Sequence, residues 1–119
     1  MKPKDFKRLL VRDGGRCPHC GEMEALAPNH RINRGMGGSK VLDFPANYVL
    51  LCSIMNGQIE ADHRWAALAE SYGWKLKSWQ NPLTEPVFDT LTGEWRLLDN
   101  NWGFIVITQK KSEPPAHNK

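Results

Sequence analysis

The sequence contains no long hydrophobic run. Its longest apolar stretch is Tyr48–Cys52, whereas a helix that crosses a bilayer needs roughly 20 apolar residues. Residues 1–15 carry basic side chains without an apolar segment, so we expect neither a secretory signal nor a membrane partner. Cysteine is also scarce, and three residues, an odd number, favour thiols or metal ligands in a reducing compartment over a disulfide framework. We therefore expect a cytoplasmic protein.

The sequence has little excess charge of either sign, with a net charge of +3. The charge is unevenly distributed: residues 1–40 balance at +5, residues 41–100 at −4 and residues 101–119 at +2. A basic first third could steer a phosphate backbone towards a site in that part of the chain. A solvated, lysine-rich terminus explains the same charges equally well. Charge alone therefore does not decide whether the partner is a nucleic acid.

The length of 119 residues, with 40% hydrophobic and 24% charged residues, predicts one domain over residues 1–108. Hydrophobic periodicity and turn residues predict a helix, a strand, a glycine-rich loop, a strand and a long helix, over Asp5–Asp13, Leu26–Ile32, 33–46, Tyr48–Cys52 and Ile54–Tyr72. Four further strands are expected at Lys75–Trp79, Pro86–Asp89, Glu94–Leu98 and Phe104–Thr108. The polar, proline-containing segment 109–119 is expected to be a disordered tail. These elements predict the α+β class.

The cysteines follow a metal-binding spacing. Cys17 and Cys20 form a Cys-x-x-Cys pair, and two thiolates on such a knuckle make half of a tetrahedral zinc site. A second pair would begin at Cys52, but its last position is Met55, a poor zinc ligand. The pattern therefore predicts an incomplete zinc site of three cysteines, which a histidine, His19 or His63, would have to complete. Alternatively, the three cysteines are small buried hydrophobic residues.

A second group of residues combines one possible general base with neutral oxygen ligands. His30 can accept a proton from water near physiological pH. Asn29, Asn47 and Asn56 offer amide oxygens, which are acceptable ligands for a hard cation such as Mg²⁺. Each residue also has an ordinary structural explanation, since asparagines populate turns and caps and most single histidines are structural.

The order of these motifs resembles the HNH endonuclease family. The motifs are Arg12–Gly21 with its Cys-x-x-Cys-Gly knuckle, Asn29–Gly38 ending in Arg-Gly-Met-Gly-Gly, and Pro45–Cys52 with its Asn-x-x-Leu-Leu-Cys strand. The resemblance covers about residues 5–74 and is greatest to small HNH proteins of actinobacterial phages. It implies a ββα-metal core over about residues 16–74, preceded by a helix and knuckle, with a β-hairpin extension over residues 75–108.

The resemblance also implies roles for individual residues. His30 matches the general base, Asn47 the middle Asn that braces the loop, and Asn56 the third motif residue, which is often histidine. Asn29 matches the metal ligand before the base, where the family usually has Asp or His. A catalytic Mg²⁺ or Mn²⁺ held by Asn29 and Asn56 would therefore receive no protein charge, so its binding without DNA should be weak.

The activity implied by the resemblance is hydrolysis of DNA phosphodiester bonds by nicking or double-strand cutting. Arg31, Arg34 and Lys40 would contact the DNA backbone, and the phage terminase or packaging machinery would be a further partner. Two other functions stay open. The departure at Asn29 favours a catalytically weak, HNH-fold DNA-binding protein, and the cysteines alone would suit a zinc-ribbon-like interaction module.

Overall fold

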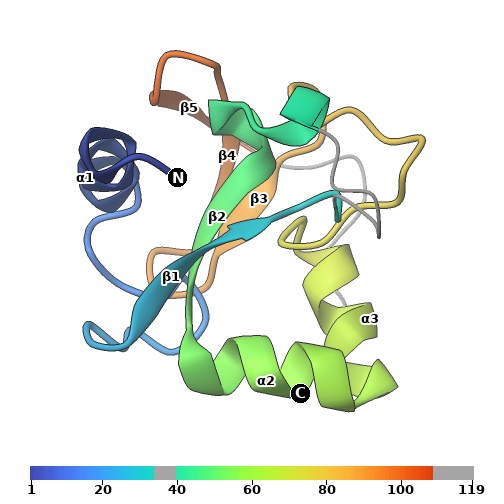
Figure 1. The fold of residues 1–119 in the computed structure, drawn as a ribbon. Helices are drawn as coiled ribbons and strands as arrows, with labels where there is room; N and C mark the ends of the chain where they lie inside the picture. The colour runs from blue at the N-terminus through green and yellow to red at the C-terminus, as the bar shows by residue number, and fades with distance from the viewer. Residues whose placement is uncertain (34–39, 109–119) are drawn as a thin grey trace.

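The computed structural model describes residues 1–33 and 40–108 and confirms the α+β class (Figure 1). The expected tail, 109–119, lies outside the described residues. Within the described chain, helices and strands follow in the order α1 (Pro3–Arg12), β1 (Leu26–His30), β2 (Tyr48–Cys52), α2 (Ser53–Ala61), α3 (His63–Ser71), β3 (Val87–Asp89), β4 (Glu94–Leu98) and β5 (Phe104–Ile107). Short 3-10 turns, η1 (Lys40–Leu42) and η2 (Pro45–Asn47), precede β2. None of the described helices is long and apolar enough to cross a membrane.

The first sheet is an antiparallel pair of β1 and β2, with Leu26 opposite Cys52 and His30 opposite Tyr48. All five residues of β2 are buried. Both strands of a two-stranded sheet are edge strands, which is where a proline such as Pro28 of β1 is tolerated. The helix α2 begins directly after β2. The chain thus runs strand, loop, strand, helix, as expected.

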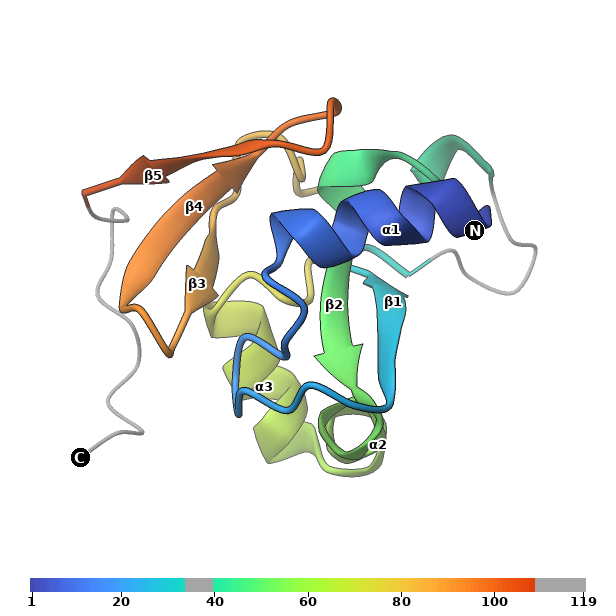
Figure 2. The same ribbon diagram turned by 90° about the vertical axis from the view of Figure 1, so that its left-hand side faces the viewer.

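Helices cover both faces of this hairpin (Figure 2). On one face, Leu9 of α1 packs with Tyr48 and Leu50. On the other, Val49 and Leu51 belong to a larger cluster that also contains residues of α2 and α3. Because alternate side chains of a strand point to opposite faces, a continuous apolar run such as β2 requires cover on both sides.

The single long helix expected over Ile54–Tyr72 is wrong, because the chain forms two helices that meet at Asp62. Asp62 is extended, with φ −136° and ψ 119°, and its carboxylate accepts a hydrogen bond from the backbone NH of Arg64 at 2.9 Å. An aspartate in this conformation caps a new helix and interrupts the previous one. The apolar periodicity continues across Asp62, so the periodicity gave no sign that the helix is interrupted there.

The strand expected at Lys75–Trp79 is also wrong, because this segment forms bends and a turn, with Leu76 buried and residues 77–79 exposed. The backbone NH groups of Trp74 and Lys75 both donate to the carbonyl of Ala69, which ends α3. Gly73 has φ +78°, and a Cβ there would collide with the carbonyl of Pro86. Only glycine fits this close crossing of two chain segments.

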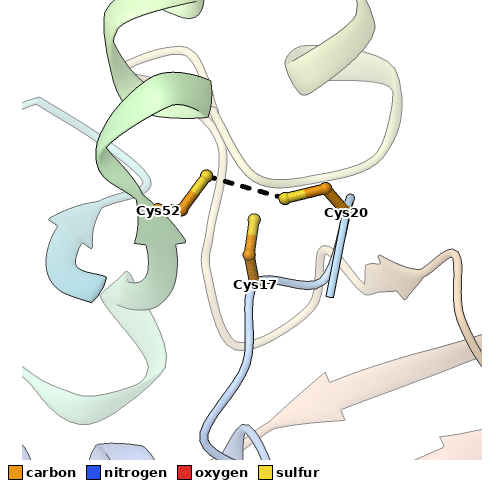
Figure 3. A group of neighbouring side chains, drawn as sticks. All are labelled: Cys17, Cys20 and Cys52. Carbon is orange, nitrogen blue, oxygen red and sulfur yellow. Dashed lines mark hydrogen bonds between the residues drawn. The ribbon is translucent and has the colours of Figure 1, made fainter. Parts of the chain in front are cut away.

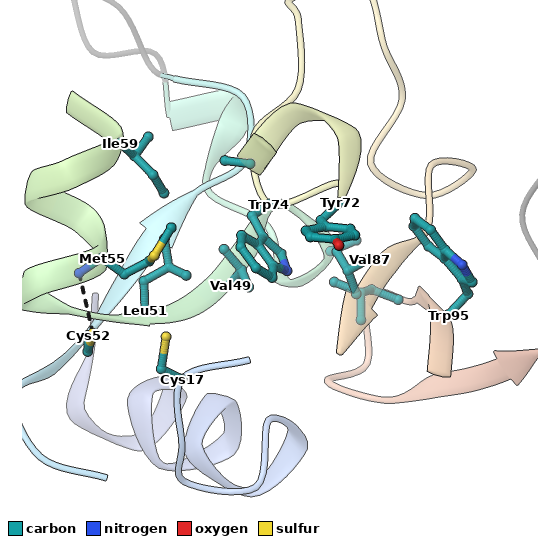
Figure 4. Packing of buried hydrophobic residues seen from close by; sticks show 13 residues of the cluster. Cys17, Val49, Leu51, Cys52, Met55, Ile59, Tyr72, Trp74, Val87 and Trp95 are labelled. Carbon is teal, nitrogen blue, oxygen red and sulfur yellow. Dashed lines mark hydrogen bonds between the residues drawn. The ribbon is translucent and has the colours of Figure 1, made fainter. Parts of the chain in front are cut away.

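The second sheet is antiparallel, in the order β3-β4-β5, and confirms the other three expected strands to within a residue at most ends. It shares a hydrophobic cluster with the first sheet. Figure 4 shows Trp74 and Tyr72 between Val49 of β2 and the pair Val87 and Trp95 of the second sheet. The extension is therefore packed onto the hairpin unit.

Candidate functional site

The three cysteines come together in space. Their sulfur atoms all lie within 4.8 Å of one another, and those of Cys20 and Cys52 are 3.6 Å apart (Figure 3). Ligands at about 2.3 Å from a tetrahedral zinc would be about 3.8 Å apart. Cys17 and Cys20 come from the knuckle, and Cys52 from the start of α2. The arrangement could hold a metal ion such as zinc.

The knuckle that presents Cys17 and Cys20 is built from local and distant hydrogen bonds. Gly21, with φ +80°, donates to the carbonyl of Cys17 at 2.9 Å, which closes the turn. The Thr90 hydroxyl donates to the carbonyls of Pro18 and His19 at 2.7 and 2.8 Å. The turn after β3 therefore helps to hold the knuckle in place.

The chemistry of the cluster suits a cation. Cys17 and Cys52 are buried. Burial, together with the nearby Cys52 and Cys17 sulfurs, raises the pKa of the Cys20 thiol to about 11, despite an opposing backbone hydrogen bond from Glu22. A raised pKa favours the protonated thiol, whereas a bound metal would favour the thiolate by binding it. The sulfur of Cys52 already accepts a hydrogen bond from the NH of Met55 at 3.4 Å, so the first turn of α2 faces the cluster.

Neither histidine expected to complete the cluster joins it. Among the described residues, the group that could hold a metal consists of the three cysteines alone. The ring of His19 instead packs edge-on against Trp65 and Trp74, at 5.4 and 5.6 Å, and His63 is exposed at the start of α3. The described residues therefore supply three ligands to the cluster, and neither of these histidines is the fourth.

His30, the expected general base, is the last residue of β1 and is paired with a carboxylate. Its Nε2 lies 2.8 Å from Oδ1 of Asp43, and its ring is 4.7 Å from that of Tyr48. The side chains of His30 and Asp43 are 23% and 33% exposed, so the pair is accessible to a substrate. Sequence reasoning missed Asp43, because the loop that carries it has no periodicity that would place it beside β1.

Asn47, for which the resemblance implied a bracing role, is buried and hydrogen-bonded to the backbone. Its buried side chain accepts from the NH of Ile32 at 2.8 Å and donates to the carbonyls of Ile32 and Leu42 at 3.2 and 2.9 Å. The chain is thereby tied together on either side of residues 34–39. Asn47 has no hydrogen bond to His30 in the described structure, so its role is to hold the loop ends.

Asn29 and Asn56, the expected metal ligands, differ in the hydrogen bonds that their side-chain amides make. The Asn29 amide donates to the carbonyl of Ala27 at 3.1 Å. Asn56 lies in the first half of α2, and its Oδ1 is the only buried side-chain oxygen or nitrogen in the described residues without a hydrogen-bond partner. Such an orphaned acceptor costs free energy unless something binds it. An amide oxygen in this state fits a hard cation.

Arg31 does not contact DNA, and this expectation is wrong. The residue has 0% exposure, and its guanidinium donates to four backbone carbonyls. The acceptors lie 2.6–3.0 Å away, on Gly73, Ala46, Pro82 and Glu85. Its role is to join β1, the loop and the segment after α3.

The other two residues expected to contact DNA are not tested by the structure. Arg34 lies outside the described residues, and Lys40 begins η1, with its side chain outside the description. A different cation, Lys75, does lie beside the site. Its Nζ donates to the carbonyl of His30 at 3.0 Å and to Oδ1 of Asn33 at 3.2 Å. Lys75 therefore holds the end of β1 and Asn33 together through hydrogen bonds.

The described residues thus include an accessible His30–Asp43 pair, a buried and hydrogen-bonded Asn47, an Asn56 oxygen without a hydrogen-bond partner, and a three-cysteine cluster. Functional interpretation depends on these contacts and on the sequence motifs. No protein-family model, curated protein or solved structure matches the chain.

Proposed function

We propose that this protein is a metal-dependent endonuclease of the HNH type that hydrolyses DNA phosphodiester bonds, with His30 as the general base. The observation that carries the proposal is the accessible His30–Asp43 pair, at 2.8 Å, where β1 ends. A carboxylate on one imidazole nitrogen orients the ring and stabilises the imidazolium that forms when the other nitrogen takes a proton.

The pairing assigns the two nitrogens of His30. Nε2 carries the hydrogen that Asp43 accepts, which leaves Nδ1 as the atom that removes a proton from water. The resulting hydroxide attacks phosphorus, and the bond from phosphorus to the 3′-oxygen breaks. Asn47 and Lys75 hold the loop and the end of β1 in place during this step.

Asn56 and Asn29 are the residues that would hold the catalytic Mg²⁺ or Mn²⁺. When bound, the cation stabilises negative charge on the phosphate and the leaving oxygen. Both ligands are neutral amides, so the phosphates of the substrate must supply the negative charge, and DNA should strengthen metal binding. The orphaned Oδ1 of Asn56 supports this role.

The cysteine cluster would serve as a structural zinc centre, distinct from the catalytic cation. It would join Cys17 and Cys20 of the knuckle to Cys52, the N-cap of α2. Because α2 carries Asn56, zinc would help to position the catalytic helix. This arrangement assigns separate metals to folding and to chemistry.

The experiment that tests the proposal is nicking of supercoiled plasmid DNA. We expect conversion to the open circle with Mg²⁺ or Mn²⁺ and none after addition of excess EDTA, because the substrate charge is neutralised only by the cation. Plasmid that is bound but never cut would favour the DNA-binding scaffold. Zinc content without either DNA binding or cutting would favour the interaction module.

Zinc removal gives a second prediction. The purified protein should contain about one zinc per chain, and prolonged chelation should lower the free energy of unfolding by about 3–4 kcal/mol, the value for a ligand held at roughly 100–1,000 times its Kd. Cys52→Ser should abolish zinc binding, whereas Met55→Cys supplies a fourth thiolate and should slow zinc loss. Metal analysis and urea unfolding measure both effects.

The matched control for these variants is His63→Ala, because His63 is exposed and outside the cluster. It should leave zinc content and unfolding unchanged. A parent protein that carries no zinc after purification in zinc-supplemented medium would contradict the structural zinc centre, while leaving the nicking experiment unaffected.

A further inference from the structure

A row of aromatic rings extends from His30 towards α1. The ring of Tyr48 lies 4.7 Å from His30, and the ring of Trp102 lies 6.3 Å from Tyr48, tilted by 25°. The guanidinium of Arg12 lies 5.9 Å from the centre of the Trp102 ring. Tyr48 belongs to the hairpin, but Trp102 comes from the turn between β4 and β5. The extension therefore contributes an aromatic side chain next to Tyr48, which in turn lies against His30.

The backbone at Trp102 is strained. Its φ is +60°, a conformation that a bulky residue rarely adopts and that costs about 1–3 kcal/mol. The turn is braced against this cost, because Oδ1 of Asp99 accepts from the NH groups of Asn101 and Gly103 at 2.7 and 2.9 Å. The side chain of Asn100 accepts from the NH of Ala46 at 3.1 Å, which fastens the turn to η2.

Trp102 lines two hollows on the surface. One, of about 280 Å³, also includes Lys2 of the α1 N-cap, Tyr48 and Asp43, the partner of His30. The other, of about 260 Å³, includes Lys7 and Arg8 of α1. The indole therefore stands between two hollows that each contain cationic side chains, and one of them adjoins the His30–Asp43 pair.

The carboxylates in this region already have hydrogen-bond partners. Asp43 contacts His30, and Asp5 lies 3.4 Å from Arg8. Lys2, the N-cap of α1, and the helix residues Lys4 and Lys7 are exposed. Basic side chains that track a backbone, together with an aromatic ring on which a base can stack, are the features of sites for single-stranded nucleic acid.

We propose that the two hollows between α1 and the β4–β5 turn form a binding groove for an unpaired stretch of DNA, with a base stacked on Trp102. The inference rests on the proposed function in one respect, since the strand it holds would be the one cut beside His30. The cations of α1 contact phosphates, and the indole contacts a base without reading its identity. The groove would make frayed, gapped or single-stranded DNA a better substrate than intact duplex.

The strain at Trp102 supports this assignment over simple packing. Trp102 does pack at the edge of the cluster of Leu9, Tyr48 and Leu50. Packing alone, however, does not account for a positive φ at a bulky residue. A strained conformation held by surrounding hydrogen bonds is more typical of a binding position.

The test is binding of a fluorescein-labelled thymidine oligonucleotide and of a matched duplex, measured by fluorescence anisotropy in the His30→Ala background, where cutting is expected to be about 10²–10⁴-fold slower. Trp102→Leu, which removes the aromatic ring, should weaken single-strand binding by about 5–100-fold and duplex binding much less. Trp102→Phe, which keeps a ring, should retain most of the affinity. Trp79→Leu is the matched control, because Trp79 is 80% exposed and lines neither hollow.

A second measurement does not depend on the leucine variant folding. Bound oligonucleotide should quench tryptophan fluorescence in the parent, and Trp102→Phe should lose much of that quenching while Trp79→Phe keeps it. Equal quenching in Trp102→Phe and the parent would overturn the proposal, as would equal weakening of single-strand and duplex binding by Trp102→Leu.

The outcome is separable from that of the nuclease proposal. A protein that binds the oligonucleotide through Trp102 but never nicks plasmid would retain the groove and reject the nuclease. A protein that nicks plasmid, but whose oligonucleotide affinity is unchanged by Trp102→Leu, would retain the nuclease and reject the groove.

Discussion

Replacing His30 by alanine is expected to lower the rate of plasmid nicking by about 10²–10⁴-fold, the usual cost of losing a general base. Zinc content should stay close to that of the parent, because His30 lies outside the three-cysteine cluster. DNA affinity should also stay close, because His30 is partly exposed at the end of β1 and its loss leaves the other contacts in place. Gel quantification of nicking at saturating protein measures the rate. A variant that nicks as fast as the parent would show that His30 is not the base.

Variants of neighbouring residues separate the base from the metal site. Asn56→Ala removes a ligand, so raised Mn²⁺ should partly restore its nicking, which the same treatment should not do for His30→Ala. Asp43→Asn keeps the shape of the partner but removes its charge, and should slow nicking by about tenfold or more. Asn29→Asp adds a charged ligand and should tighten metal binding in the absence of DNA. His63→Ala should be silent in every assay.

The second large effect is expected for stability and not for nicking chemistry. Burial, and then the nearby Arg12 guanidinium, lower the pKa of Arg31 to about 9, so the side chain is still protonated at neutral pH. Arg31→Met leaves the four carbonyls that it serves without partners. The loss should amount to about 3–5 kcal/mol of unfolding free energy, as for other broken buried charge networks. Urea unfolding measures it.

Two controls sharpen the interpretation of the Arg31 variant. Arg31→Lys keeps the charge but replaces a planar fork of five donors with a single ammonium, so most of the stability should still be lost. Arg64→Met removes an arginine whose side chain is 80% exposed, and should change the free energy of unfolding by less than about 1 kcal/mol. An Arg31→Met protein as stable as the Arg64→Met protein would mean that the four carbonyls are satisfied in another way.

The sequence predicted several elements whose determining interactions are local. Tyr48–Cys52 is a strand, as its apolar run indicated, and the strands after Pro86 follow their turn residues. The knuckle also followed from spacing, since a Cys-x-x-Cys-Gly turn closes on itself by the bond from Gly21 to Cys17. The meeting of Cys52 with the knuckle was expected from the order of the motifs, and the sulfur distances confirm it.

Only the tertiary structure decided which side chains meet across the loop and the extension. Arg31 and His30 are adjacent in sequence, yet one is enclosed by four carbonyls and the other is accessible. Asp43 and Trp102 reach the site from segments without periodicity, so no pattern placed them there. The physical reason is that periodicity shows which side of an element is buried. The partners of polar and aromatic side chains depend instead on which distant segments of the chain fold back beside them. The positions of those segments are set by packing of the whole core.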